Sequence, residues 1–262
     1  MDKISTFMQG KTALVGGASQ GIGQATAMAL AEMGAKVIAL ARSEKKLDEL
    51  VTRLPGTGHS YIACDVGERA RLRAMVTKAL ESSGSIDVLI CNAGGPKGGP
   101  IELAQDAQFE EAIAHHLLAN SALAQICLPG MKEKRWGRIV NIISTSVRIP
   151  IPGLGVSNVA RAAVAAWAKT LSLEVAAFGI TVNSVLPGYT KTPRLESLLA
   201  ANSEKTGKSR ASVESEWRAS IPAGRFGEPE EVAAAIAFLA SPAASYINGI
   251  CLTVDGGRTG SL

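Results

Sequence analysis

A glycine-rich segment near the start of the chain contains the first residues whose types and spacing suit a particular chemistry. Residues 16–23 read Gly-Gly-Ala-Ser-Gln-Gly-Ile-Gly, between a short apolar run and an amphipathic one. Glycines let the backbone turn tightly and approach a pyrophosphate, and the N-terminus of a following helix adds free N–H groups and a positive dipole end. Because the segment lies between a predicted strand and a predicted helix, we expect a dinucleotide site rather than a plain turn. Its candidate binding residues are Gly17, Ser19, Gln20, Gly21, Ile22 and Gly23.

The end of the second apolar run indicates which dinucleotide binds. This run ends at Ala41 and is followed by Arg42. An acidic residue here would accept hydrogen bonds from the ribose 2′-hydroxyl of NAD, whereas a guanidinium can hold a 2′-phosphate in a bidentate fork. The sequence therefore favours NADP over NAD. The alternative is that Arg42 is a solvated residue at the start of a helix.

The elements that must position these residues alternate between short apolar runs and longer amphipathic ones. Most apolar runs are continuous, which is typical of parallel strands covered on both faces. The predicted strands are 12–16, 36–41, 60–64, 86–91, 138–143, 181–186 and 250–254. The predicted helices are 22–33, 69–82, 108–128, 158–177 and 230–240. This rhythm predicts an α/β protein: one Rossmann-type domain over residues 1–262, with a doubly wound parallel seven-stranded sheet and helices on both faces.

One region interrupts the alternation. From residue 193 to residue 222 the chain is polar and helix-prone, and it follows the end of a predicted strand. It is too long for a tight turn, and an excursion of this length is typical of a substrate lid. A disordered surface loop is the alternative.

Composition and charge argue against several classes of function. The 262 residues include 27 basic and 23 acidic ones, a net charge of +4 with no basic run, which argues against nucleic-acid binding. Cys64, Cys91, Cys127 and Cys251 form no CxxC pair, so we interpret them as buried reduced thiols and expect no metal site. No segment reaches the roughly 18 apolar residues of a membrane span, and residues 1–11 lack a signal-peptide core. We therefore expect a cytoplasmic protein that binds no membrane.

Further motifs follow one another from about residue 10 to residue 258. They are Gly17-xxx-Gly21-x-Gly23, Cys64-Asp65-Val66, Asn92-Ala93-Gly94, Pro187-Gly188-Tyr189-Thr190-Lys191-Thr192, Arg225-Phe226-Gly227, Phe238-Leu239-Ala240-Ser241 and Val254-Asp255-Gly256-Gly257. With these motifs the chain resembles the short-chain dehydrogenase/reductase family, of the 3-oxoacyl-ACP-reductase type, except that Gly16 replaces a threonine. The resemblance implies that Asp65 and Val66 bind the adenine. It also implies that the cofactor site includes Asn92, Ala93, Gly94, Pro187, Gly188, Thr190 and Thr192.

The family's catalytic positions are occupied by other residues in this sequence. In the family a tyrosine donates a proton to the substrate carbonyl while the nicotinamide delivers hydride, and a lysine four residues later shares its helix face. A serine thirteen residues before the tyrosine and an asparagine on an earlier helix complete the set. By spacing these positions fall on Ser157, Arg161, Ser144 and His116, in that order. No tyrosine lies between Tyr61 and Tyr189, so no shift in register restores the motif.

These replacements change the expected chemistry. A serine hydroxyl is shorter and less acidic than a phenol and donates a proton only with help from a base or water. Arg161 keeps a positive charge that could hold the ribose, and Ser144 can still bind a carbonyl. His116, with an ordinary pKa near 6.5, or Tyr189 beside the nicotinamide pocket could replace the phenol, although both could simply be packing residues. Arg148 and Arg194 could bind an anionic substrate or be ordinary solvated arginines.

Three functions remain open at this point. The first is an NADP-dependent oxidoreductase that acts on a small carbonyl or alcohol, with a relocated proton donor or with water relayed by Ser157. The second is a regulatory protein that binds NADP without chemistry, and the third is a lyase or isomerase that reuses the cleft. The resemblance also implies a homotetramer or dimer, and the Ala-rich faces of the helices at 108–128 and 158–177 suit close packing between subunits.

Overall fold

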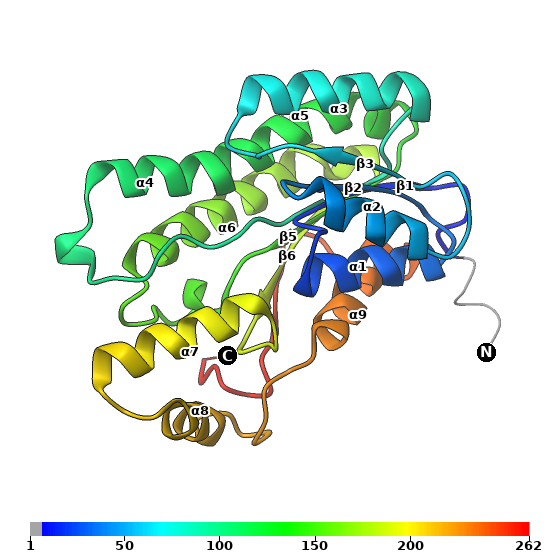
Figure 1. The fold of residues 1–262 in the computed structure, drawn as a ribbon. Coiled ribbons are helices and arrows are strands. Elements are labelled where there is room, and N and C mark those ends of the chain that lie inside the picture. The colour runs from blue at the N-terminus through cyan, green and yellow to red at the C-terminus, as the bar shows by residue number, and fades with distance from the viewer. Residues whose placement is uncertain (1–6, 262) are drawn as a thin grey trace.

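Seven parallel strands form the centre of the structure, a computed structural model that describes residues 7–261. Their order across the sheet is β3-β2-β1-β4-β5-β6-β7 (Figure 1). The strands are β1 (Thr12–Gly16), β2 (Lys36–Ala41), β3 (Ser60–Ala63), β4 (Val88–Cys91), β5 (Gly137–Ile142), β6 (Ile180–Pro187) and β7 (Cys251–Val254). The predicted Rossmann-type fold is confirmed, and all seven predicted strands are present with bounds that differ by two residues or fewer.

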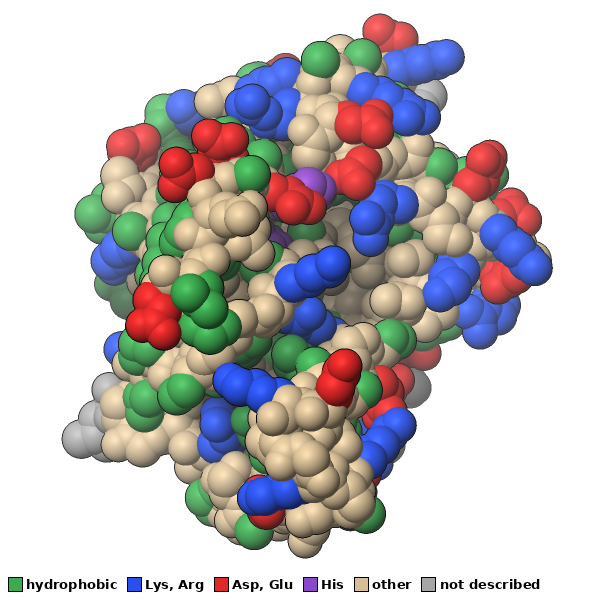
Figure 2. All heavy atoms as spheres, turned by 60° about the vertical axis from the view of Figure 1, so that its left-hand side comes forward, with side chains coloured by type: hydrophobic (Ala, Val, Ile, Leu, Met, Phe, Trp, Pro, Cys, Tyr) green, Lys and Arg blue, Asp and Glu red, His purple; other side chains and the backbone are tan. Residues whose placement is uncertain are grey.

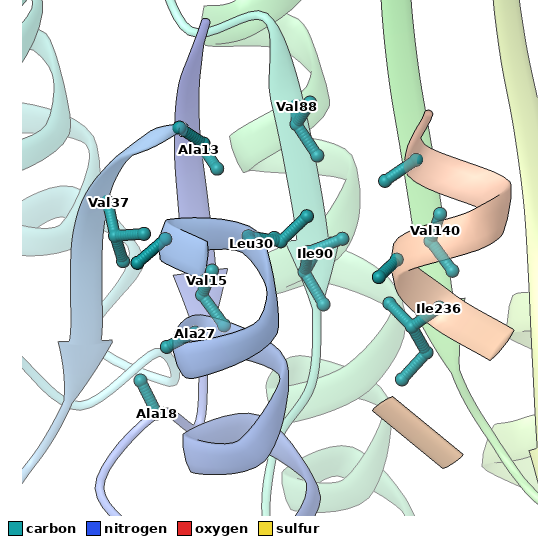
Figure 3. Close-up of a cluster of buried hydrophobic side chains, with 14 of the residues drawn as sticks. Ala13, Val15, Ala18, Ala27, Leu30, Val37, Val88, Ile90, Val140 and Ile236 are labelled. Atoms are coloured by element: carbon teal, nitrogen blue, oxygen red, sulfur yellow. The ribbon is translucent and has the colours of Figure 1, made fainter. Parts of the chain in front are cut away.

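The strands form where the sequence is continuously apolar because both faces of the sheet are covered. On one face, α1 (Gly21–Glu32), α2 (Glu44–Arg53) and α9 (Pro229–Ala240) pack against the strands. Figure 3 shows this layer, where Val15, Ile90 and Val140 of three neighbouring strands lie beneath Leu30 of α1 and Ile236 of α9. The opposite face is covered by α3 (Arg69–Ser83), α5 (Ala119–Glu133) and α6 (Gly155–Val175).

Two elements differ from the sequence expectations, and a third settles an alternative. The helix α2 was not predicted, because its sequence is mostly polar and it buries only Leu47 and Leu50. The single helix expected at 108–128 consists of α4 (Asp106–Ile113), a π-helical turn (Ala114–Leu118) and α5. The region 193–222, which the sequence predicted to be helix-prone, contains two helices, α7 (Pro193–Thr206) and α8 (Arg210–Ala219), and so differs from the alternative of a disordered loop.

The helices α7 and α8 stand apart from the two layers on the sheet (Figure 1). They have a small core of their own: Leu195, Leu199, Val213, Ile221 and Phe226. The segment therefore has a defined shape beside the ends of β6 and β7. Its position is compatible with the lid that the sequence suggested.

Three further sequence expectations concern membrane spans, the cysteines and the N-terminal segment. No helix within residues 7–261 is both long and apolar enough to cross a membrane. The four cysteines are free thiols, of which Cys251 is half-buried and the others are buried. The expectation about the N-terminal segment lies partly outside the described residues, because it includes residues 1–6.

Candidate active site

The glycine-rich turn lies at the carboxyl edge of the sheet, between the end of β1 and the start of α1. Gly17 has a φ of +61°, and a Cβ there would lie 2.4 Å from the side-chain nitrogen of Asn92. A Cβ on Gly23 would lie 2.2 Å from the carbonyl oxygen of Gly17. No other residue fits either position, so the glycines keep open a backbone cradle at the first turn of a helix. Such a cradle fits a pyrophosphate group.

Two distant segments complete this cradle. The Asn92 amide, directly after β4, donates a hydrogen bond to the Gly16 carbonyl at 3.3 Å. Gly94 faces open space, because a Cβ there would meet nothing within 4 Å. From the other side, Thr192 at the N-cap of α7 lies against the turn, with its methyl group 3.0 Å from a Cβ on Gly21. Residues predicted from three separate motifs therefore meet at one point.

The other end of the cleft lies at the ends of β2 and β3. Arg42 is exposed, and its Nη1 lies 3.7 Å from Oδ2 of Asp65. Asp65 also accepts a hydrogen bond from the Gly67 amide at 2.9 Å. Val66 is partly buried against the core beneath it. The predicted 2′-phosphate and adenine residues are thus neighbours in space.

Sequence reasoning missed two residues at this end. Lys46, in the first turn of α2, donates a hydrogen bond from its Nζ to Gln20 at 3.0 Å and so places a second cation against the glycine-rich turn. His115 contacts Asp65 Oδ1 through Nε2 at 2.9 Å and the Glu111 carbonyl through Nδ1 at 2.9 Å. Recognising α2 would have revealed Lys46, but nothing local in the sequence links residue 115 to residue 65.

The catalytic candidates meet at the carboxyl end of β5. Ser144 follows this strand, and its Oγ accepts a hydrogen bond from the Ser146 amide at 3.1 Å. Ser157 lies in the first turn of α6, is half-buried, and makes no side-chain hydrogen bond within residues 7–261. The helix α6 packs against the short turn after Ser144 and against the π-helical turn that holds His116. Three of the four mapped positions are thus brought together by α6.

Arg161, the fourth position, lies on α6 one turn after Ser157 and is 8% exposed. Its Nη1 donates a hydrogen bond to the Ile142 carbonyl at 2.9 Å, and its Nε has no partner among the described residues. Burial and the nearby Arg194 lower the pKa of Arg161 to about 10, so it remains a cation at neutral pH. A buried guanidinium with an unused donor is suited to binding an oxygen of a ligand.

His116 is 3% exposed, and its Nε2 has no hydrogen-bond partner in the described chain. Burial, followed by the charges of Arg161, His115 and Arg194, lowers the pKa of His116 to about 2. This differs from the expected imidazole that titrates near pH 6.5. The ring is neutral throughout the physiological range, so any role it has is that of a neutral hydrogen-bonding group.

Tyr189 is held in an aromatic cluster at the base of α7 and α8. Its ring stacks on Trp217 with centroids 4.6 Å apart and meets the edge of Phe226 at 6.0 Å. The guanidinium of Arg258 lies over the ring at 4.4 Å and donates a hydrogen bond to its hydroxyl at 3.3 Å. Burial raises the pKa of Tyr189. These contacts describe a packed aromatic side chain whose hydroxyl is already engaged.

The rest of the segment after β6 connects the sheet to the lid region. Pro187 is the last residue of β6, and a Cβ on Gly188 would lie 2.6 Å from the Cβ of Asp255. Thr190 is buried, and its hydroxyl donates to the Gly188 carbonyl at 3.2 Å. These contacts fix the direction in which the chain enters α7.

A cavity of about 260 Å³ lies next to the turn that follows Ser144. It is lined by Thr145, Ile149, Pro150, Ile151, Pro152, Ser220, Arg258 and Thr259. Figure 2 shows a hollow on one face of the molecule, with acidic side chains and a histidine above it and basic side chains below it. The arrangement can hold a dinucleotide along the sheet edge and a small molecule beside Ser144.

Comparisons with known proteins agree with this geometry. A family model described as enoyl-(acyl carrier protein) reductase matches residues 17–259. The 3-oxoacyl-(acyl-carrier-protein) reductase FabG of Vibrio cholerae is 36% identical over 250 residues, 95% of this chain and 98% of the relative.

Two solved structures are also similar. The L-sorbose reductase of Gluconobacter frateurii, complexed with NADPH and L-sorbose, has a TM-score of 0.92 and 30% identity, and covers 98% of this chain and 100% of its own. An actinorhodin polyketide ketoreductase with NADPH has a TM-score of 0.91 and 32% identity, and the match covers 96% of this chain and 98% of the ketoreductase chain.

Proposed function

The chain belongs to the short-chain dehydrogenase/reductase family, and we propose that it is an NADPH-dependent reductase of carbonyl substrates in which Ser157 and Arg161 take the places of the family's tyrosine and lysine. It is an oxidoreductase of the 3-oxoacyl-ACP-reductase type, and its cofactor is NADP. The observation that carries the proposed site is the buried Arg161 with its unpartnered Nε, one helical turn from Ser157.

The described residues fit NADP along the whole carboxyl edge of the sheet. The backbone cradle of Gly17 to Gly23 would hold the pyrophosphate, with Ser19, Ile22 and Thr192 around it. Arg42 and Lys46 would bind the 2′-phosphate, because two cations lie at the ribose end and Gln20 holds one of them in place. Asp65 and Val66 would border the adenine, while Asn92, Ala93 and Gly94 would border the nicotinamide ribose together with Arg161.

When bound, NADPH would supply a hydride to the carbonyl carbon, which would leave negative charge on the carbonyl oxygen. Ser144 donates a hydrogen bond to that oxygen, and the Arg161 guanidinium stabilises its negative charge. A preorganised cation in a site with little water is worth several kcal/mol of barrier, on the order of a hundredfold to a thousandfold in rate. Arg161 thus takes over the electrostatic part of the role that a phenol–lysine pair has in the family.

The proton for the product alcohol comes through Ser157. Its hydroxyl is half-buried and free of other hydrogen bonds in the described structure, so it can donate to the product oxygen and regain a proton from water. His116 is neutral, and Tyr189 is fixed in its aromatic cluster with a pKa that burial raises, so we assign the proton to neither of them. Their proposed roles are to line the pocket and to anchor the lid.

The other assignments belong to the same proposal. Residues 193–222 act as the substrate lid, supported by their position beside the ends of β6 and β7. A homodimer or tetramer is supported by exposed apolar side chains on α6, where Leu173 is 69% exposed and Val159 is 42% exposed. A cytoplasmic location is supported by four free cysteines.

Titration of the purified protein with NADPH and NADH, followed by nicotinamide absorbance over a panel of ketones and oxo acids, tests the proposed function. We expect tighter binding of NADPH than of NADH, and NADPH oxidation with at least one class of carbonyl compound. Tight NADPH binding with no oxidation by any carbonyl compound would contradict the proposal. A product formed without any change in nicotinamide absorbance would indicate a non-redox reaction in the same cleft.

A further inference from the structure

Arg161 and Arg194 are cations of the cleft without a counter-charge. No carboxylate within residues 7–261 lies within ion-pair distance of Arg161 or Arg194, whereas eight other lysine and arginine side chains of the described chain have such a partner. Removing a charge from water without a partner is costly, and two like charges that face each other add to the cost. The positive charge of Arg194 acts on both Arg161 and His116 and lowers the pKa of each. The three groups therefore share one electrostatic environment.

Arg138 shows what a buried arginine looks like when the protein alone satisfies it. It is 2% exposed, and its guanidinium donates to the carbonyls of Gly137, Gly179 and Ser241. It also stacks on Trp136 at 4.6 Å. Arg161 has one carbonyl partner and an unused buried Nε. The difference indicates that Arg161 is completed by a molecule that is not part of the chain.

Arg194 reaches over the same cleft from the lid. It lies in the first turn of α7, and its Nη2 donates a hydrogen bond to the Pro96 carbonyl at 2.7 Å, in the loop after β4. Its guanidinium carbon is 3.4 Å from a Cβ on Gly95, so the planar group lies against the open backbone of that loop. The side chain is half-buried. It thus links the lid to the segment that lines the nicotinamide end.

From these contacts we infer that the substrate of this reductase is an anion, a carbonyl compound that carries a carboxylate, and that Arg194 binds the carboxylate while Arg161 faces the reacting oxygen. This inference rests on the proposed function and adds the substrate class to it. A guanidinium matches a carboxylate in a bidentate, charge-assisted arrangement. The cavity that begins at Thr145, next to Ser144, has an apolar wall of Ile149 to Pro152 that could take the rest of the substrate.

In the proposed arrangement, the cofactor does not neutralise the positive charges of Arg161 and Arg194. Its pyrophosphate has the glycine cradle and its 2′-phosphate has Arg42 and Lys46, while the reduced nicotinamide is uncharged. An anionic substrate in this position would also join the lid to the sheet edge through Arg194, which would exclude water from the reacting carbonyl.

Steady-state kinetics of three proteins, the wild type, Arg194→Gln and Arg210→Gln, test the inference. Each protein is measured with oxo acids and with the methyl esters of those acids. Arg210 is the matched control, because it is exposed on the same lid and pairs with Glu196. We expect wild type to favour the acid over its ester by at least about tenfold in kcat/KM. Arg194→Gln should lose this preference by raising the KM for the acid, and Arg210→Gln should keep it. NADPH affinity should change by less than about threefold in both variants.

Two results would overturn the inference while leaving the proposed function intact: equal kcat/KM for acids and esters in wild type, or an Arg194→Gln variant that loses NADPH affinity as much as it loses affinity for the acid. The second result would assign Arg194 to the cofactor pyrophosphate. If no carbonyl compound is reduced, calorimetric titration of the NADP⁺ complex with the oxo acids shows whether the anion site, the reductase activity or both are refuted. Binding that depends on Arg194 would keep the anion site and refute the reductase, and no binding would refute both.

Discussion

The two edges of the sheet treat buried ionisable side chains in opposite ways. At the amino edge, the carboxylate of Asp87 is 1% exposed and receives hydrogen bonds from the Thr12 amide and from Lys134. Arg138, at the start of β5, is satisfied by three carbonyls. At the carboxyl edge, beyond the end of the same strand, Nε of Arg161 and Nε2 of His116 are buried without partners.

This contrast separates residues that hold the fold from residues that serve a ligand. A buried polar atom without a partner costs about 1–3 kcal/mol of folding stability, so a protein keeps one only where something else offsets the cost. The satisfied side chains of Asp87 and Arg138 stabilise the sheet at its amino edge. The unsatisfied side chains of Arg161 and His116 at the carboxyl edge reduce stability, and we propose that cofactor and substrate complete them. Mutations at the two edges should therefore have opposite consequences.

The largest expected effect is at Arg161. Arg161→Gln removes the cation beside the reacting oxygen and should lower kcat by about a hundredfold to a thousandfold. Because it also removes a buried unpaired charge, the midpoint of thermal unfolding should stay the same or rise. Parallel measurements of kcat and thermal unfolding check this. A lower unfolding midpoint would make Arg161 a structural residue like Arg138.

At the opposite end of β5, Arg138→Met should give the reverse pattern. It removes the donor shared by three buried carbonyls and should reduce the free energy of unfolding by about 2–4 kcal/mol. Urea denaturation measures this loss, and kcat per folded molecule should be unchanged at low temperature. A selective loss of kcat in a stable variant would remove the distinction between the two edges.

His116 should make the carboxyl edge sensitive to acid. Its folded pKa of about 2 is below its ordinary value, so the unfolded chain takes up the proton first as the pH falls. The neutral ring therefore makes its full contribution to the free energy of unfolding above about pH 6.5. Below that pH the contribution falls by up to about 1.4 kcal/mol per pH unit. Urea denaturation of wild type and His116→Gln at pH 7 and pH 5 measures how much unfolding free energy each protein loses between the two pH values. Wild type should lose roughly 2 kcal/mol more than the variant, and equal losses would show that the ring is not held neutral.

The smallest effect is expected at the exposed cofactor end. Arg42→Ala should weaken NADPH binding by about tenfold, because Lys46 remains, and leave NADH binding unchanged. Fluorescence titration with both nucleotides measures the ratio. Equal losses for both would mean that Arg42 does not bind the 2′-phosphate.

The sheet and its carboxyl-edge motifs were predictable because their signals are local. Continuous apolar runs gave strands such as β1 and β2 with their bounds unchanged, and the glycine turn lies where a strand meets a helix. The partners of the site residues were not predictable in this way. A π-helical turn orients His115 toward Asp65, fifty residues away in sequence, and buries His116 beside Arg161. The unused donors of these side chains depend on every element packed around them, which no spacing in the sequence reveals.

The most direct test of the contrast between the two edges is the rate of NADPH oxidation by wild type and Arg161→Gln in the presence of an oxo acid, measured by nicotinamide absorbance beside the NADPH affinity of each protein. We predict steady oxidation by wild type, and an Arg161→Gln variant that binds NADPH but oxidises it at least about a hundredfold more slowly. Equal rates in the two proteins would contradict the account, because the unpartnered guanidinium at the carboxyl edge would then have no part in the reaction.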